Sequence, residues 1–265
     1  MVRKLTTKTE FIDENGIVDD AVKICKVVKN LELIGETGTG KTLLGHFLAD
    51  YFKLPLFELT LSIDTNRWEL VASDILSKGE TVVRDGIVLM WLKTKKAVLL
   101  VNGFNYAPAN VISLFESLAD WTNKIYIPEM QTEFERSPEH YLIVTMNPYE
   151  KSGYAGTHQM NIATMRRFEP IYMHYLSPMK ETELIQKHYN DYDWARKLVE
   201  FASKTRTLYK EGKLTMPLTT GNLINYAGLK SMDTSDSRII SIACAHYLDE
   251  ERPTVKRLWE ESEVK

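Results

Sequence analysis

The chain alternates between short apolar runs and longer stretches in which apolar positions recur at helical spacing. Short apolar runs are typical of buried strands, and helical spacing is typical of amphipathic helices. The sequence predicts strands at residues 31–34, 54–63, 97–101, 141–146 and 170–175 and helices at 17–28, 43–52 and 109–121. This alternation predicts a parallel sheet covered by helices on both faces.

The pattern changes after Pro178, where strand signals stop and only helical patterns remain. We therefore predict two domains, an α/β domain over residues 1–177 and a small helical domain over residues 178–265. Within the first domain, residues 124–140 alternate weakly around two prolines, which predicts a hairpin.

A glycine-rich segment separates the first predicted strand from the helix that follows it. It matches the phosphate-binding pattern G-x-x-x-x-G-K-[ST] at each position: Gly35, Glu36, Thr37, Gly38, Thr39, Gly40, Lys41 and Thr42. Such glycines let backbone N–H groups surround a polyphosphate at the positive end of a helix, which Leu43 continues here. Lys41 would reach the β- and γ-phosphates, and the Thr42 hydroxyl would coordinate Mg²⁺. An ordinary glycine-rich turn is the alternative, but the flanking strand and helix favour a nucleotide site.

Composition and charge fit a globular protein that can bury a large core. The chain has 265 residues, of which 44% are hydrophobic. Its net charge of −3 gives no sign of the basic surface that general nucleic-acid binding requires. Cys25 and Cys244 lie in apolar helical patterns and are predicted to be buried thiols. The tryptophans also fall mostly on helical faces and are predicted to lie in the core. With no bilayer-length apolar run and no signal-peptide pattern, we expect a cytoplasmic protein without membrane contact.

Two further segments, behind the glycine-rich loop, carry a resemblance to a known family. Residues 141–148 (YLIVTMNP) are similar to a sensor-1 strand, and residues 154–168, which end in Arg166, Arg167 and Phe168, are similar to an arginine-finger segment. The chain thus resembles AAA+ ATPases of the MoxR/CbbQ and midasin-like (dynein-related) branch over nearly its whole length. The resemblance implies a P-loop fold with five parallel strands in the order 5-1-4-3-2, a helical lid, and ATP or ADP with Mg²⁺.

The resemblance also implies roles for polar residues beyond the loop. Asn147 would hold the attacking water or the γ-phosphate. Arg167, with Arg166 as the neighbouring candidate, would reach the γ-phosphate of an adjacent subunit, which requires a ring. The alternative is that Asn147 starts a turn and that the two arginines form a solvated or structural pair.

The chain departs from the family pattern where a buried strand usually ends in Asp-Glu. Asn102 and Gly103 occupy these positions. Asn102 can accept a hydrogen bond from metal-bound water but carries no charge, and Gly103 cannot polarise the attacking water. We expect nucleotide binding with Thr42 and Asn102 on the metal side, and slow hydrolysis. A carboxylate from elsewhere, such as Glu36, Asp64 or Glu116, is the alternative.

Further departures and insertions concern the lid and the partners. Gly221 stands where the family usually has a sensor-2 arginine, with Thr219 and Thr220 as candidate helix caps. Residues 77–86 and 124–140 resemble the family's two insertions, which line a pore or meet a partner, often a protein with a von Willebrand A domain. The alternative is that these hairpins are exposed and contact nothing.

The sequence is compatible with three functions. The first is a chaperone-like AAA+ remodelling ATPase that forms a homo-oligomeric, hexameric ring. The second is a nucleotide-binding structural or regulatory subunit without turnover, which could sit in a mixed ring. Asn102 and Gly103 favour the second, whereas Asn147 and Arg167 favour the first. A nucleic-acid motor is disfavoured because the chain has no basic stripe.

Overall fold

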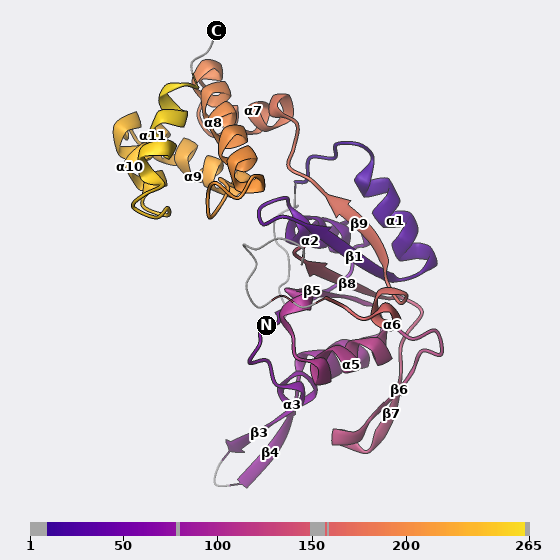
Figure 1. Cartoon of the computed structure of the whole chain (residues 1–265). Coiled ribbons are helices and arrows are strands. Elements are labelled where there is room, and N and C mark those ends of the chain that lie inside the picture. The colour runs from indigo at the N-terminus through magenta and orange to yellow at the C-terminus, as the bar shows by residue number, and fades with distance from the viewer. Residues whose placement is uncertain (1–9, 78–79, 149–156, 158, 263–265) are drawn as a thin grey trace. The chain divides into compact units, whose positions relative to one another are not determined.

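The computed structural model describes residues 10–77, 80–148, 157 and 159–262 (Figure 1). Backbone contacts divide the chain into two compact units. The first ends at Met173 and the second begins at His174, except that Thr37–Thr39 group with the second unit. The predicted boundary between two domains, at residues 177 and 178, lies four residues beyond this division and stays a prediction.

The first unit is built on a five-stranded sheet in which all neighbouring strands are parallel. The strand order is β2-β5-β8-β1-β9. Numbered along the chain as strands one to five, this is the predicted order 5-1-4-3-2. The strands are β1 (Asn30–Gly35), β2 (Leu56–Thr60), β5 (Ala97–Asn102), β8 (His140–Met146) and β9 (Glu169–Met173). β2 is shorter than predicted, and the predicted α/β P-loop fold class is confirmed.

The sheet has a hydrophobic core on each face. Successive residues of a strand contribute to these two cores in turn, because their side chains point to opposite faces of the sheet. Val98 and Leu100 of β5 join the core that includes the inner faces of α1 (Ile17–Val27) and α2 (Lys41–Phe52). Leu99 and Val101 join the core on the other face. That face is covered by α3 (Arg67–Val71), α4 (Ile87–Lys93) and α5 (Ala109–Leu118). Figure 1 shows α1 and α5 on opposite sides of the sheet.

Two antiparallel hairpins interrupt the α/β alternation. β3 (Ala72–Ser77) pairs with β4 (Glu80–Asp85) between α3 and α4, and β6 (Lys124–Ile127) pairs with β7 (Thr132–Glu135) after α5. The second hairpin lies where weak alternation predicted it. The first overlaps the predicted insertion at residues 77–86 but begins five residues earlier, at Ala72. Short helices complete the unit: η1 (Phe104–Tyr106), η2 (Pro128–Met130) and α6 (Ile162–Met165).

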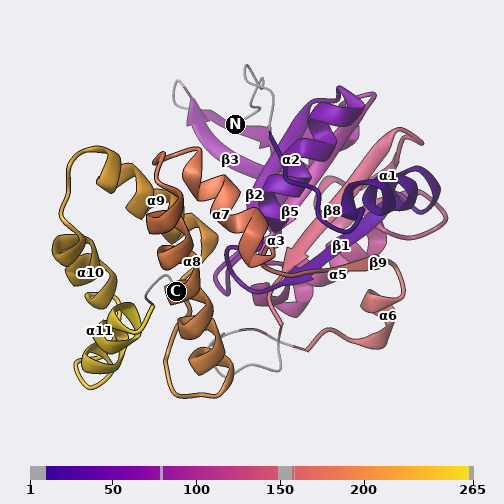
Figure 2. The same cartoon turned by 90° about the horizontal axis from the view of Figure 1, so that it is seen from above.

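The second unit is helical over its described residues, as the loss of strand patterns predicts. α8 (Tyr192–Lys210) packs against α7 (Pro178–Gln186), α9 (Thr220–Ser231) and α11 (Arg252–Glu260), and α10 (Asp236–Cys244) packs against α9 and α11 (Figure 2). Glu181 and Arg206 form an ion pair of 2.7 Å in its interior. Both cysteines are buried free thiols, as predicted. Trp121 contradicts the core prediction for tryptophans, since it is 87% exposed beyond the end of α5.

Candidate nucleotide-binding site

The P-loop joins the end of a central strand to the start of a helix. β1 ends at Gly35 and α2 begins at Lys41. Gly38 and Gly40 have φ angles of 82° and 89°, in the left-handed region that glycine adopts without strain. Gly40 precedes α2, and no described side chain caps this helix start. The first N–H groups of α2 therefore form the kind of positive helix end that binds phosphate.

Lys41 is held at the base of this loop by neutral oxygen atoms. Its Nζ donates to the carbonyl oxygens of Gly35 at 2.7 Å and Glu36 at 2.8 Å, and to Asn147 Oδ1 at 3.1 Å. Burial lowers the pKa of Lys41 to about 8. A cation removed from water is stabilised by an anion, so this desolvated ammonium fits the polyphosphate of a nucleotide.

Asn147 follows the last residue of β8, the strand that lies beside β1 in the sheet. Its carboxamide contacts Lys41, donates from Nδ2 to Tyr106 Oη at 3.3 Å, and its backbone carbonyl accepts from Asn105 Nδ2 at 2.8 Å. The structure thus brings Asn147 to the P-loop lysine, where the family resemblance expects a polar side chain. Its role in orienting water or phosphate stays a prediction.

Asn102 ends β5 and lies against the hydroxyl of the P-loop threonine. Its Oδ1 accepts from Thr42 Oγ1 at 2.8 Å and from Thr145 Oγ1 at 3.1 Å. Oxygen ligands and hydroxyls are what Mg²⁺ and its water shell require, so Thr42 and Asn102 fit the metal side of the site.

Sequence reasoning missed a carboxylate beside Asn102. Asn102 Nδ2 donates to Glu58 Oε1 at 2.9 Å, and His46 Nε2 lies 3.0 Å from Glu58 Oε2. In the register of β2 and β5, Thr60 is opposite Asn102 and Glu58 is opposite Leu100. Because side chains alternate along strands, Glu58 and Asn102 lie on the same face. An acidic residue inside a predicted parallel strand was the available signal.

Gly103 occupies a conformation that disfavours side chains. Its φ is 68°, and a Cβ would lie 3.0 Å from the carbonyl oxygen of Leu61 and 3.3 Å from Cδ2 of Tyr106. The backbone at this position therefore favours glycine over the usual glutamate.

Three carboxylates are alternatives to the missing pair, and they differ in their surroundings. Glu36 is buried in the P-loop itself, whereas Asp64 is exposed in the loop after β2. Glu116 accepts hydrogen bonds from Thr164 Oγ1 within α6 and from Nδ2 of Asn161, the residue that caps the start of α6. Replacement of the missing pair by one of these residues stays an untested alternative.

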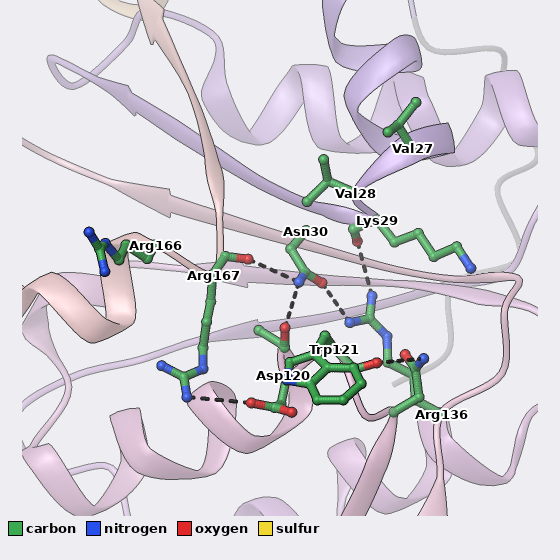
Figure 3. A pocket seen from close by; sticks show the side chains of 11 residues that line it. Val27, Val28, Lys29, Asn30, Asp120, Trp121, Arg136, Arg166 and Arg167 are labelled. Atoms are coloured by element: carbon green, nitrogen blue, oxygen red, sulfur yellow. Dashed lines mark hydrogen bonds and ion pairs between the residues drawn. The ribbon is translucent and has the colours of Figure 1, made fainter.

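The two candidate finger arginines lie near the amino end of β1, whereas the P-loop of the same chain lies at its carboxyl end. Arg167 Nη1 donates to Ala163 O at 2.7 Å, and its Nη2 lies 3.4 Å from Asp120 Oδ2. Both arginines line a cavity of about 530 Å³ near Asn30, the first residue of β1 (Figure 3). The P-loop begins at Gly35, the last residue of β1, so this cavity lies at the opposite end of β1 from the P-loop.

This cavity, which we call the arginine pocket, combines buried and exposed groups. Arg136 is 3% exposed and donates from Nη1 to Asn30 Oδ1 at 2.5 Å and to Leu118 O at 2.9 Å. Asn30 Nδ2 in turn donates to Arg167 O at 3.0 Å. Figure 3 shows Asn30 between the guanidinium of Arg136 and the backbone carbonyl of Arg167, and Trp121, whose side chain is exposed, lines the same pocket. The buried network fixes the backbone from which Arg167 projects.

The remaining predicted positions lie in the lid and in the finger segment. Thr219 caps α9 by accepting from the backbone N–H of Asn222, whereas Thr220 is the first helical residue, and Gly221 follows it. Residues 154–156 and 158 of the finger segment lie outside the described residues. Among the helices that the structure describes, none has the length and apolar character of a membrane span.

Comparison with known proteins places the chain in a family. Residues 30–168, more than half of the chain, match the AAA domain of the dynein-related subfamily. The chain belongs to this family of AAA+ domains, so it is a P-loop protein of ATPase type for which nucleotide and, usually, Mg²⁺ are the implied ligands. Membership of the MoxR-like branch stays a prediction.

One relative and two solved structures are similar to the chain over most of its length. An uncharacterized protein of Staphylococcus saprophyticus is 26% identical over 215 residues, which cover 78% of this chain and 80% of the relative. A crystal structure of a protein assigned as an ATPase from Cytophaga hutchinsonii has a TM-score of 0.51 at 18% identity and covers 94% of this chain and 89% of its own. A variant of RuvB from Thermotoga maritima has a TM-score of 0.54 at 13% identity, covering 88% and 75%. These two structures support the fold alone.

Proposed function

We propose that this chain is an ATP-binding subunit of a ring that remodels or regulates a partner protein and that hydrolyses ATP slowly by itself. The observation that carries the proposal is the combination of a complete P-loop with Asn102 and Gly103 at the end of β5. ATP with Mg²⁺ would supply the polyphosphate charge and the metal ion that neutralises it.

The residues of this chain divide the binding task. Lys41 and the N–H groups at the start of α2 would hold the phosphates, and Thr42 with Asn102 would hold the metal and its waters. Asn147, fixed by Lys41 and Tyr106, would orient the γ-phosphate or a water. Asn102 is neutral and Gly103 has no side chain, so neither position supplies the carboxylate that normally activates water, which supports slow turnover.

Arg167 would act between subunits. Its position at the sheet edge opposite its own P-loop supports a role toward a neighbouring copy in a ring, and a hexamer is the size that we propose. The hairpins β3–β4 and β6–β7 are the proposed contacts for a pore or for a partner with a von Willebrand A domain. We propose a cytoplasmic location for this assembly.

A second candidate is a structural or regulatory subunit without turnover in a mixed ring. The backbone at Gly103 favours it, because the left-handed conformation disfavours any side chain that could replace the missing glutamate.

One experiment separates these functions. Steady-state ATP hydrolysis by the purified chain is measured beside its affinity for a fluorescent ATP analogue. Tight binding with slow but measurable turnover supports the first function, and tight binding with no turnover supports the second. Absence of nucleotide binding would overturn both.

A further inference from the structure

We propose that Glu58 and Asn102 work as one unit in which Glu58 carries the negative charge that position 102 lacks. This inference rests on the proposed function, since it assigns the metal side of the same nucleotide site. Glu58 is a positioning residue: it acts on the nucleotide-bound metal through Asn102. The contact that carries the inference is the 2.9 Å hydrogen bond from Asn102 Nδ2 to Glu58 Oε1.

The carboxylate decides which way the Asn102 amide faces. An ionised carboxylate only accepts hydrogen bonds, so Asn102 must present its NH₂ group to Glu58. The amide oxygen then faces the hydroxyls of Thr42 and Thr145, both of which donate to it. Without the carboxylate, the amide could present its nitrogen to Thr42, and the metal side would lose its oxygen acceptor.

His46 holds the carboxylate in place from the helix that follows the P-loop. Its Nε2 lies 3.0 Å from Glu58 Oε2, so both oxygens of Glu58 are engaged, one by α2 and one by β5. The side chains of His46 and Glu58 are 13% and 32% exposed. α2 also carries Thr42, and the unit therefore connects the P-loop helix, β2 and β5 on one face of the sheet.

The negative charge that the family pattern places at the end of β5 is carried here by a side chain of the neighbouring strand β2. In the family pattern, the acceptor at the end of β5 is itself an aspartate. Here an amide stands at the end of β5, and the carboxylate stands on β2. A hydrogen bond to an ionised acceptor polarises the donor group, so Glu58 increases the negative charge on Asn102 Oδ1. The pair can thus order metal-bound water without a carboxylate at position 102.

A reciprocal exchange of the two residues tests the inference. The full chain is prepared as wild type, Glu58→Gln, Asn102→Asp, and the double variant Asn102→Asp with Glu58→Gln. Glu200→Gln on α8, a carboxylate that is 39% exposed and paired with Lys204, is the matched control. Affinity for a fluorescent ATP analogue is measured with excess Mg²⁺ and with EDTA, and each variant is followed by thermal unfolding.

Glu58→Gln should reduce the gain in affinity that Mg²⁺ provides by about fivefold, the upper range for a partly screened charge, and leave the affinity in EDTA unchanged. The double variant should recover the Mg²⁺ gain, because it returns one carboxylate and one amide to the pair. Asn102→Asp alone places two carboxylates in contact, so its unfolding temperature should lie below that of the double variant.

Two outcomes would overturn the inference while leaving the proposed function intact. In the first, Mg²⁺ increases the nucleotide affinity of Glu58→Gln by as much as it increases that of the wild type. In the second, Mg²⁺ increases the affinity of the double variant by no more than that of Glu58→Gln. A wild-type chain that binds no nucleotide in either condition would overturn the proposed function and this inference together.

Discussion

The ammonium of Lys41 lies 3.1 Å from the carboxamide oxygen of Asn147, which joins the P-loop to the end of β8. The two residues are distant in sequence but meet because β1 and β8 are parallel neighbours whose carboxyl ends share one edge of the sheet. The phosphate-binding lysine and the candidate sensor residue therefore belong to a single site.

Replacing Lys41 by alanine should weaken nucleotide binding at least about tenfold, or about 1.4 kcal/mol. The substitution removes the cation that would meet the β- and γ-phosphates. A titration with a fluorescent nucleotide measures the effect, and Lys26→Ala, at an exposed position of α1, is the matched control. Equal affinity of wild type and Lys41→Ala would contradict the P-loop assignment.

Replacing Arg167 by alanine should reduce assembly that depends on nucleotide without unfolding the monomer. The side chain contacts Asp120 and Ala163 O at a partly exposed position, and such contacts contribute at most about 1 kcal/mol. Light scattering with and without ATP and Mg²⁺ measures the assembly, and Arg196→Ala on α8 is the control. A wild-type chain that is monomeric at every concentration would contradict a homo-oligomeric ring and leave the mixed ring.

The wild-type chain should hydrolyse ATP far below the rate of about 1 s⁻¹ that is typical for enzymes. Restoring the pair with Asn102→Asp and Gly103→Glu would raise the rate only if position 103 accepted a side chain. Its φ of 68° and the nearby Leu61 carbonyl predict instead that the double substitution destabilises the fold by about 1–3 kcal/mol.

Gly103→Ala separates backbone strain from charge, because it adds a Cβ without a carboxylate. In urea unfolding, the free energy of unfolding of Gly103→Ala should fall by about as much as that of a single Gly103→Glu variant. Fast hydrolysis by the wild-type chain would contradict the prediction of slow turnover. It would mean either that another carboxylate has replaced the missing pair or that the pair is misplaced at the end of β5.

Glu32 should make the stability of the protein depend on pH. It is 3% exposed in the central strand β1, and burial raises its pKa from 4.5 to about 7. Between these values the folded chain binds a proton that the unfolded chain has lost, so stability falls as pH rises from about 4.5 to 7.

The variant Glu32→Gln removes this titration and tests the effect. It should be more stable than wild type by up to about 3 kcal/mol at pH 8, with a difference near zero at low pH. Urea unfolding across this pH range measures the difference. A difference that is the same at all pH values would show that Glu32 is not the group responsible.

The fold class and the phosphate-binding loop follow from local patterns in the sequence. Apolar runs such as residues 97–101 form strands because they bury both faces of a parallel sheet. The loop from Gly35 to Thr42 is recognisable because phosphate binding needs its glycines and its lysine at a fixed spacing. The hairpin at 124–140 and the helical region after Pro178 were also predictable from local spacing.

The tertiary structure decided which polar residues meet. Glu58 and Asn102 are 44 residues apart, and their contact depends on the register of β2 against β5. His46 reaches the same carboxylate because α2 packs on this face of the sheet. The strain at Gly103 and the position of Arg167 opposite its own P-loop likewise depend on backbone conformation and strand direction. Hydrophobic periodicity specifies which face of an element is buried, but strand register and helix packing determine its polar neighbours.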